Sequence, residues 1–379
     1  MENKTWFEKN PKKTYAMLFA FFFVLLEIFL RVLVSYNVIP YERYPTSSNP
    51  VFWDNIDPVV GVWKYSNSSL HHESACFDVV YESNSYGARD IERNRHSMGK
   101  QRTVVLGDSY AEGFGVQSEN RITDLLEERT GIEHLNFGTS GSFGSVQEWL
   151  LYEHKASKFD HTDVFIFMLP FNDFSDNNPN DFSKDHYRPY VKKVNGKFEV
   201  YYTTDFVKKE KAVKKEKNFR ATPEIIKNTI DNTFYTANFL RWATREIKKG
   251  LGLKKKKISE NIVPPYDKFS EGDLEILLYT YRKIGRVANG RNVYIFTIPA
   301  EVDFYVAQKR GYDFKLVREL KKFVSQYDNM FFKDLLPGFL RHAQKNNLEY
   351  DDYTLGCNGH WGNLGHKVAA GIVFDAVYK

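Results

Sequence analysis

The chain has 379 residues, of which 42% are hydrophobic and 27% are charged, a balance typical of a folded globular protein. This composition excludes a disordered chain and a collagen-like chain, and two cysteines are too few for a disulfide-rich scaffold. The mean hydropathy of −0.49 excludes a protein that crosses a membrane many times.

The net charge of +5 is distributed unevenly along the chain. Residues 192–257 contain 19 Lys and Arg against 7 Asp and Glu, which is a local excess of +12, so the remainder carries −7. A run such as Lys254 to Lys257 is typical of a solvated face, and it also suits an anionic membrane surface or a polyanionic glycan. Nucleic-acid binding through this insert would require it to face the cytoplasm, and we predict no nucleic-acid partner.

A membrane anchor is predicted near the N-terminus. Residues 15–34 are apolar except for Glu27 and Arg31. A span of 20 residues is long enough to cross a hydrocarbon core of about 30 Å. Glu27 and Arg31 are four residues apart, so they can pair on one helical face, or Arg31 can reach the interface. No small-x-small cleavage site follows the apolar run. We therefore expect an uncleaved transmembrane signal anchor over residues 15–36.

The flanking charges predict the orientation of this anchor. Four lysines precede it, namely Lys4, Lys9, Lys12 and Lys13. Under the positive-inside rule, residues 1–14 form a cytoplasmic tail and the body lies outside. The sequence thus predicts a single-pass protein of the cell inner membrane whose body faces the periplasm or the exterior. There, Cys76 and Cys357 could form a disulfide or remain two thiols.

The rest of the chain divides into residues 37–98, an extracytoplasmic linker and N-terminal strand region, and residues 99–379, a larger domain with an insert at about 190–262. Continuous apolar runs predict buried strands, hydrophobic periodicity predicts helices, and Asn195-Gly196 predicts a hairpin turn. The predicted strands are 77–81, 103–106, 164–169 and 293–298, the hairpin joins 190–194 to 198–202, and the helices are 120–130, 271–288 and 364–377, with weaker helical periodicity over 225–247.

Strands that alternate with helices favour a parallel sheet covered by helices on both faces. In such sheets the loops at the carboxyl ends of the strands form the functional site. Polar turns stand at two of these ends, Gly107-Asp108-Ser109 after the first core strand and Asn172-Asp173 after the second.

Four short blocks carry the groups that acyl transfer needs. They are Gly107 to Gly113, Asn136 to Gly141, Phe171 to Asp173 and His360 to His366. A serine at a strand-to-helix turn is an exposed nucleophile, and its own N–H can stabilise an oxyanion. A glycine allows a second N–H to approach closely, an asparagine amide supplies a third donor, and a late histidine is a general base.

In this order the blocks resemble the SGNH (GDSL-type) hydrolase superfamily. Asn84 to Asp90 and the Leu26 to Arg31 segment of the anchor resemble a bacterial membrane-anchored branch. The resemblance implies a flavodoxin-like three-layer α/β/α sandwich with a parallel sheet and no metal or organic cofactor. It also implies that Ser109 is the nucleophile, that His360 is the base, and that the Ser109 N–H, Gly141 and Asn172 form the oxyanion hole.

The sequence departs from the family pattern at two places. Phe171 stands where a glycine usually precedes the asparagine. The acid that usually lies two or three residues before the histidine is replaced by Asn358 and Cys357. Asn358 can accept a hydrogen bond from the histidine but cannot offset an imidazolium charge, and Asp351, Asp352 or a backbone carbonyl are the alternatives.

The leading hypothesis is a membrane-anchored esterase that acts on O-acyl esters, including O-acetyl glycans, through a Ser–His acyl-enzyme mechanism. The alternatives are an O-acyltransferase on envelope glycans and a catalytically silent envelope binding protein of the same fold. His71-His72 with Glu73 lacks a second ligand pair at metal-binding spacing, so we predict no metal. His366 and Arg89 are interpreted as structural residues.

Overall fold

The computed structural model describes residues 5–36, 38–39, 41, 52–53, 55–74, 76–141, 143–180, 187–206, 223–250, 258–259, 261–356 and 358–379. Lys4, Cys357 and the run from Lys254 to Lys257 lie outside these residues. The chain forms two compact units. The first comprises Met1–Ser48, Glu73–Ala75 and Phe219–Lys257, and the second comprises Asn49–His72, Cys76–Asn218 and Ile258–Lys379.

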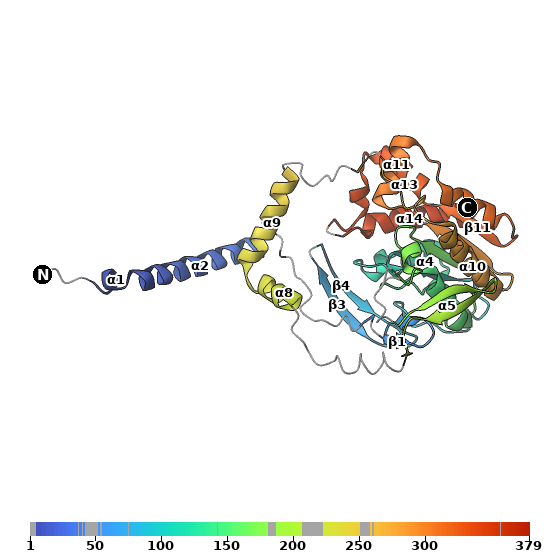
Figure 1. Cartoon of the computed structure of the whole chain (residues 1–379), viewed down its shortest axis with the longest axis horizontal. Helices are drawn as coiled ribbons and strands as arrows, with labels where there is room; N and C mark the ends of the chain where they lie inside the picture. Colours follow the sequence, from blue (N-terminus) through green and yellow to red (C-terminus); the bar gives the residue numbers. More distant parts are fainter. Residues whose placement is uncertain are drawn as a thin grey trace. The chain divides into compact units, whose positions relative to one another are not determined.

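The first unit is built around a long apolar helix, α2 (Pro11–Ser35), which follows the single turn α1 (Trp6–Lys9). Among the described residues, α2 is the one helix long and apolar enough to cross a membrane. The insert contributes α8 (Pro223–Thr233) and α9 (Tyr235–Gly250), and α9 packs against α2 (Figure 1). The weak helical periodicity of this region therefore corresponds to two helices.

The sequence left open whether Glu27 pairs with Arg31, and the structure gives its carboxylate partners outside α2. The Glu27 carboxylate accepts hydrogen bonds from the backbone N–H groups of Tyr235 at 2.8 Å and Thr236 at 3.0 Å. These groups open α9, where the first N–H groups of a helix lack partners within the helix and carry partial positive charge. The carboxylate therefore caps a second helix from within the apolar one.

The second unit contains a five-stranded sheet in the order β11-β10-β7-β5-β6, with every neighbouring pair parallel. Its strands are β5 (Arg102–Gly107), β6 (Glu133–Asn136), β7 (Asp163–Met168), β10 (Asn292–Thr297) and β11 (Met330–Asp334). All six residues of β5 and of β7 are buried. Continuous burial explains why these strands read as uninterrupted apolar runs rather than alternating ones.

Helices cover both faces of this sheet. The chain passes from β5 to β6 in one direction and from β6 to β7 in the other, so right-handed crossovers place α4 and α5 on opposite faces. α10 packs against α5, while α14 packs against α4 and α13. The helices are α3 (Ser109–Glu112), α4 (Ile122–Thr130), α5 (Ser145–His154), α6 (Asp173–Asp176), α10 (Glu271–Ala288), α11 (Glu301–Arg310), α12 (Lys315–Val324), α13 (Leu336–Asn346) and α14 (Asn363–Val377).

The described residues also form three two-stranded sheets, which lie in the second unit except for the last two residues of β3. Their strands are β1 (Asn55–Asp57) with β2 (Gly61–Trp63), β3 (Ser69–Ser74) with β4 (Phe77–Glu82), and β8 (Pro189–Val194) with β9 (Lys197–Tyr202); the short helices are η1 (Ser118–Asn120), η2 (Ala156–Lys158) and η3 (Tyr350–Tyr353). Asn195 and Gly196 turn the β8–β9 hairpin with positive φ angles of 50° and 78°. These angles fit the type I′ turn predicted from the sequence.

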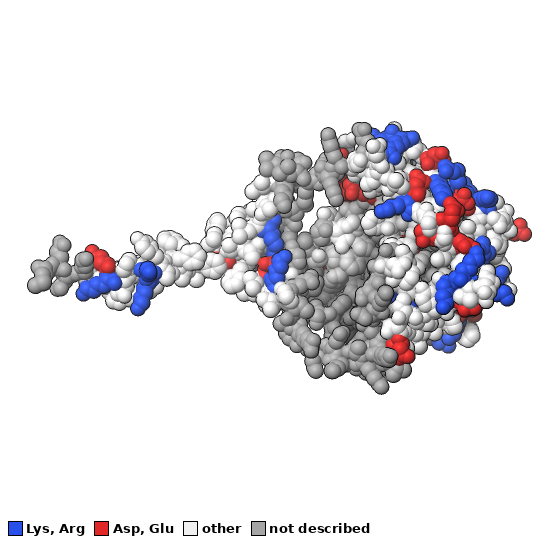
Figure 2. Space-filling model, viewed as in Figure 1, with Lys and Arg blue, Asp and Glu red and all other residues white. Residues whose placement is uncertain are grey.

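The fold is thus the predicted α/β sandwich with a parallel sheet and one apolar N-terminal helix. The lysine-rich insert is divided between the units, because Phe219–Lys257 belong to the first and the β8–β9 hairpin belongs to the second. The surface of the second unit that is visible in Figure 2 carries Lys and Arg intermixed with Asp and Glu. By contrast, α2 is nearly free of charge beyond its first turns (Figure 2).

Candidate active site

The serine stands where the central strand β5 turns into a short helix. Gly107 ends the strand with a φ of +147°, and a Cβ there would lie 2.8 Å from the Phe167 carbonyl oxygen. Asp108 then caps α3 by accepting the Tyr110 N–H at 2.9 Å. Ser109 is the first residue of that helix, so its side chain projects at the carboxyl end of the sheet.

The histidine comes from a loop that two backbone contacts hold in place. Leu355 N–H donates to the His360 carbonyl at 2.9 Å, and Gly362 N–H donates to the Tyr353 carbonyl at 2.8 Å. The buried Trp361 follows His360 and anchors the loop against the core. His360 Nε2 lies 2.7 Å from Ser109 Oγ, so the structure joins the first and the last block.

Asn358 occupies the position of the missing acid beside His360. Its Oδ1 contacts His360 Nδ1 and also accepts the His360 backbone N–H at 3.0 Å. Because a backbone N–H can only donate, the atom that faces the ring is the amide oxygen, which can only accept. His360 therefore carries its proton on Nδ1 and presents an unprotonated Nε2 to the serine. Asp352, by contrast, accepts the Glu349 N–H.

His360 lies among aromatic rings. The ring of Phe114 stacks on it with centroids 4.4 Å apart, and the ring of Tyr110 lies at 5.0 Å. This burial lowers the pKa of His360 to about 4 because it disfavours the charged imidazolium, an effect that the charge of Glu112 opposes. The imidazole is neutral at physiological pH and is free to accept a proton.

The groups expected to donate to an oxyanion are not arranged as directly as Ser109 and His360 are. Asn172 Nδ2 donates to Asp108 Oδ2 at 3.3 Å and to Asp176 Oδ2 at 3.1 Å, so both amide hydrogens face carboxyl groups. Gly141 has a φ of +98°, and a Cβ added there would meet no atom within 4 Å. Glycine is therefore favoured at this position by its backbone conformation and not by a close neighbour, while the Asn172 amide is directed toward carboxyl oxygens.

Buried carboxyl groups lie behind Asn172. Burial raises the pKa of Asp108 to about 7, and it raises the pKa of Glu148 and of Asp173 well above their ordinary values. Both carboxyl oxygens of Glu148 lack a hydrogen-bond partner among the described residues. Glu148 and Asp173 are consequently held largely as neutral acids near neutral pH, whereas Asp108 is about half ionised there.

A buried ion pair holds the second block against the serine helix. Lys64 Nζ lies 3.3 Å from Glu112 Oε1 and donates to the Gly138 carbonyl at 2.7 Å, with both side chains at most 1% exposed. Glu112 in turn accepts the Ser140 N–H at 2.8 Å and the Trp53 indole N–H at 3.0 Å. Glu112, the last residue of α3, therefore fixes the loop that carries Gly141.

Other residues singled out from the sequence have structural contacts. The guanidinium of Arg89 donates to three carbonyls after α3, those of Glu112, Gly113 and Val116. His366 is buried inside α14 and its ring packs edge-on against Trp361. His71 pairs with Asp78 on the surface, and the described residues contain no group of three or more potential metal ligands.

The sequence left open whether Cys76 and Cys357 form a disulfide or remain two thiols. Cys76 is disulfide-bonded. The only other cysteine of the chain is Cys357, next to Asn358, and it lies outside the described residues.

Loss of the Glu112 charge should destabilise the second unit. We expect Glu112→Gln to lower the free energy of unfolding by about 3–5 kcal/mol, because Lys64 would remain buried without its counter-charge. Denaturant unfolding measures this difference. Lys64→Met combined with Glu112→Gln should recover part of the loss, and Arg318→Gln, which breaks an exposed pair with Asp313, should cost about 1 kcal/mol or less. If Glu112→Gln and Arg318→Gln lowered the free energy of unfolding equally, burial would not be the reason for the strength of the Lys64–Glu112 pair.

No model of a known protein family matches the sequence, and no curated protein matches it significantly. Among solved structures, the chain is similar to a crystal structure described as a member of the lipolytic protein G-D-S-L family from Veillonella parvula DSM 2008. The two share 11% sequence identity over 74% of this chain and 100% of that chain, with a TM-score of 0.37.

Proposed function

We propose that this protein is a serine hydrolase of ester bonds, anchored to a membrane, with Ser109 as its nucleophile and His360 as its general base. The observation that carries the proposal is the 2.7 Å contact between Ser109 Oγ and an Nε2 that bears no proton. A nucleophile, a base and a group that orients the base together form the arrangement of serine hydrolases.

The first chemical step forms an acyl-enzyme. Ser109 Oγ attacks the carbonyl carbon of the ester while its proton passes to His360 Nε2. The tetrahedral adduct then collapses, the bond from carbon to the alcohol oxygen breaks, and the alcohol leaves with the proton from Nε2. Water attacks the acyl-enzyme in the second step, with His360 again accepting and returning the proton.

Stabilisation of the oxyanion is assigned to the Ser109 N–H, the Gly141 N–H and the Asn172 amide. One amide hydrogen of Asn172 would have to leave Asp108 or Asp176 and turn toward the substrate oxygen. The hydrogen bonds that it would give up are long, at 3.3 and 3.1 Å. An oxyanion is a charged and therefore strong acceptor that could replace one of them. Removal of one such donor typically costs about 10²–10³ in kcat.

Two observations support the proposed location of the catalytic body outside the cytoplasm. α2 is a 25-residue apolar helix whose N-terminal side carries Lys9, Lys12 and Lys13. Cys76 is disulfide-bonded, and disulfides persist mainly in oxidising compartments. Both fit a body that faces the periplasm or the exterior, where envelope O-acyl esters are the available substrates. Resolution of the acyl-enzyme by an acceptor hydroxyl instead of water would give O-acyl transfer.

A fluorophosphonate probe tests the nucleophile. We expect covalent labelling of the folded wild-type protein and none of Ser109→Ala, because the probe reacts with a serine that a neighbouring base activates. Ser325→Ala, a substitution at an exposed serine on another face, should label like the wild type. Labelling and aryl-acetate hydrolysis that are both absent from the wild type would favour the silent binding protein of the same fold.

The pKa of His360 predicts how the rate depends on pH. Since burial lowers this pKa to about 4, the base form persists well below the usual histidine value of about 6.5. We expect kcat/KM for an aryl acetate to stay level down to about pH 5 and to fall as the pH falls through about 4. Circular dichroism at each pH separates this ionisation from unfolding. A half-maximal rate near pH 6.5 would contradict the assignment.

Restoration of a carboxylate beside the base should raise the rate. We expect Asn358→Asp to increase kcat by at least about tenfold, because the reverse change in a serine protease costs about 10⁴. The new charge favours the imidazolium, so the acid limb of the pH profile should also move upward. Asn346→Asp, which adds the same charge at an exposed position on α13, serves as the comparison. No gain in kcat and no shift of the limb would show that Asn358 does not orient the base.

A further inference from the structure

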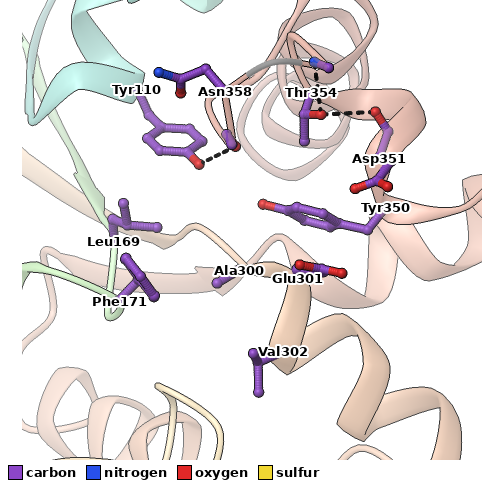
Figure 3. A pocket seen from close by; sticks show the side chains of 12 residues that line it. Tyr110, Leu169, Phe171, Ala300, Glu301, Val302, Tyr350, Asp351, Thr354 and Asn358 are labelled. Carbon is purple, nitrogen blue, oxygen red and sulfur yellow. Dashed lines mark hydrogen bonds between the residues drawn. The ribbon is translucent and has the colours of Figure 1, made fainter. Parts of the chain in front are cut away.

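A cavity of about 320 Å³, within the size range of small-molecule sites, is lined by residues that adjoin Ser109 and His360 in the sequence, although neither of these two lines it. Figure 3 shows side chains from several elements around it. Its lining residues are Tyr110, Leu169, Phe171, Ala300, Glu301, Val302, Tyr350, Asp351, Thr354, Gly356, Asn358 and Gly359.

Three residues that line the cavity are direct sequence neighbours of proposed site residues. Tyr110 follows Ser109, Phe171 precedes Asn172, and Gly359 precedes His360. The Tyr110 hydroxyl donates to the Gly359 carbonyl at 2.8 Å and so ties the serine side of the cavity to the histidine side (Figure 3). Part of an ester held at Ser109 would therefore occupy this space.

The wall combines aromatic rings with negative charge. Tyr110, Tyr350 and Phe171 supply the rings, and Glu301 and Asp351 supply the carboxylates (Figure 3). None of the twelve lining residues is Lys, Arg or His, and neither carboxylate has an ion-pair partner among the described residues. Burial and then the charge of Asp351 raise the pKa of Glu301, so the two carboxylates repel each other across the cavity.

The N-terminus of α11 also reaches the cavity, at Ala300 and Glu301, and could favour an anion instead. However, the first turn of this helix already contains Glu301 and Asp303. The Asp303 carboxyl group accepts the Ala300 N–H at 2.9 Å. Acidic side chains thus already offset the partial positive charge at the N-terminus of α11. The charged side chains that line the cavity are both negative.

We propose that this cavity binds the ammonium group of a cationic ester substrate. Ring faces and carboxylates are the two kinds of group that attract an ammonium, and here both stand within one cavity beside the nucleophile. The inference rests on the proposed hydrolase function and adds to it the charge of the substrate. The ammonium belongs to either the alcohol or the acyl portion of the ester, and both sources share this recognition chemistry.

Matched pairs of esters test the proposal and identify the source. Acetylcholine and 3,3-dimethylbutyl acetate have nearly the same shape and differ in the charge of the alcohol. The 4-nitrophenyl esters of 4-aminobutanoate and pentanoate differ in the charge of the acyl group. We expect the wild type to prefer the cationic member of one pair by about tenfold or more in kcat/KM. The pair that shows the preference identifies the portion that carries the ammonium.

The preference should depend on the two carboxylates. Glu301→Gln combined with Asp351→Asn should remove it by lowering kcat/KM for the cationic ester about tenfold. Glu128→Gln combined with Asp328→Asn removes the same charge from exposed positions elsewhere and should preserve the preference. Equal loss in both double variants would assign the effect to net charge and would overturn the cavity site.

A binding measurement separates failure of this proposal from failure of the hydrolase function. Calorimetric titration of Ser109→Ala with choline and with 3,3-dimethylbutanol reports on the cavity without catalysis. We expect choline to bind at least about tenfold more tightly than the neutral alcohol, and the Glu301→Gln/Asp351→Asn change to abolish the difference. Hydrolysis of esters without any preference for charge, together with equal binding of the two alcohols, would overturn the ammonium site and leave the hydrolase function intact.

Discussion

The contact between Ser109 Oγ and His360 Nε2 joins residues that are 251 positions apart, and the chemistry of the site depends on it. The serine is fixed because β5 is fully buried between β6 and β7. The histidine is fixed because its loop is tied at both sides and is followed by α14, which packs on α4. Both sides of the contact are therefore set by the core, and a displacement of about 1 Å would break the hydrogen bond.

Under the proposed hydrolase mechanism, an amide in place of a carboxylate changes which groups must stabilise the transition state. Asn358 fixes the tautomer and the orientation of His360, but it adds no negative charge. Burial then lowers the pKa of His360 to about 4, and a base of low pKa accepts a proton less readily. More of the transition-state stabilisation consequently falls to the oxyanion donors. Asn172 is central among them, and partial protonation of Asp108, whose pKa burial raises to about 7, makes its amide easier to release.

The sequence predicted those parts of the fold whose signal is local. The central strands β5, β7 and β10 are buried apolar runs, and α10 has buried apolar residues at helical spacing, among them Leu274, Leu277 and Tyr281. The edge strand β6 has the sequence Glu-His-Leu-Asn and therefore has no apolar run to reveal it. The contact between Asn358 and His360 also follows from short spacing. The ion pair of Lys64 with Glu112 could not be predicted, because it depends on a tertiary approach between residues 48 positions apart that leaves no periodic pattern.

Glu112 links the scaffold to the chemistry. It holds the Ser140 N–H, and it is also the carboxylate whose charge raises the pKa of His360 against the effect of burial. Lys64 and Arg89 stand close enough to lower the pKa of Glu112, so this carboxylate stays ionised although it is fully buried. Glu112, at the far end of α3, thus provides part of the electrostatic stabilisation of the imidazolium that the missing acid would provide. Lys64 and Arg89 weaken the stabilisation of the imidazolium by Glu112, because their positive charges oppose it. A carboxylate placed directly at position 358 would therefore still raise the pKa of His360.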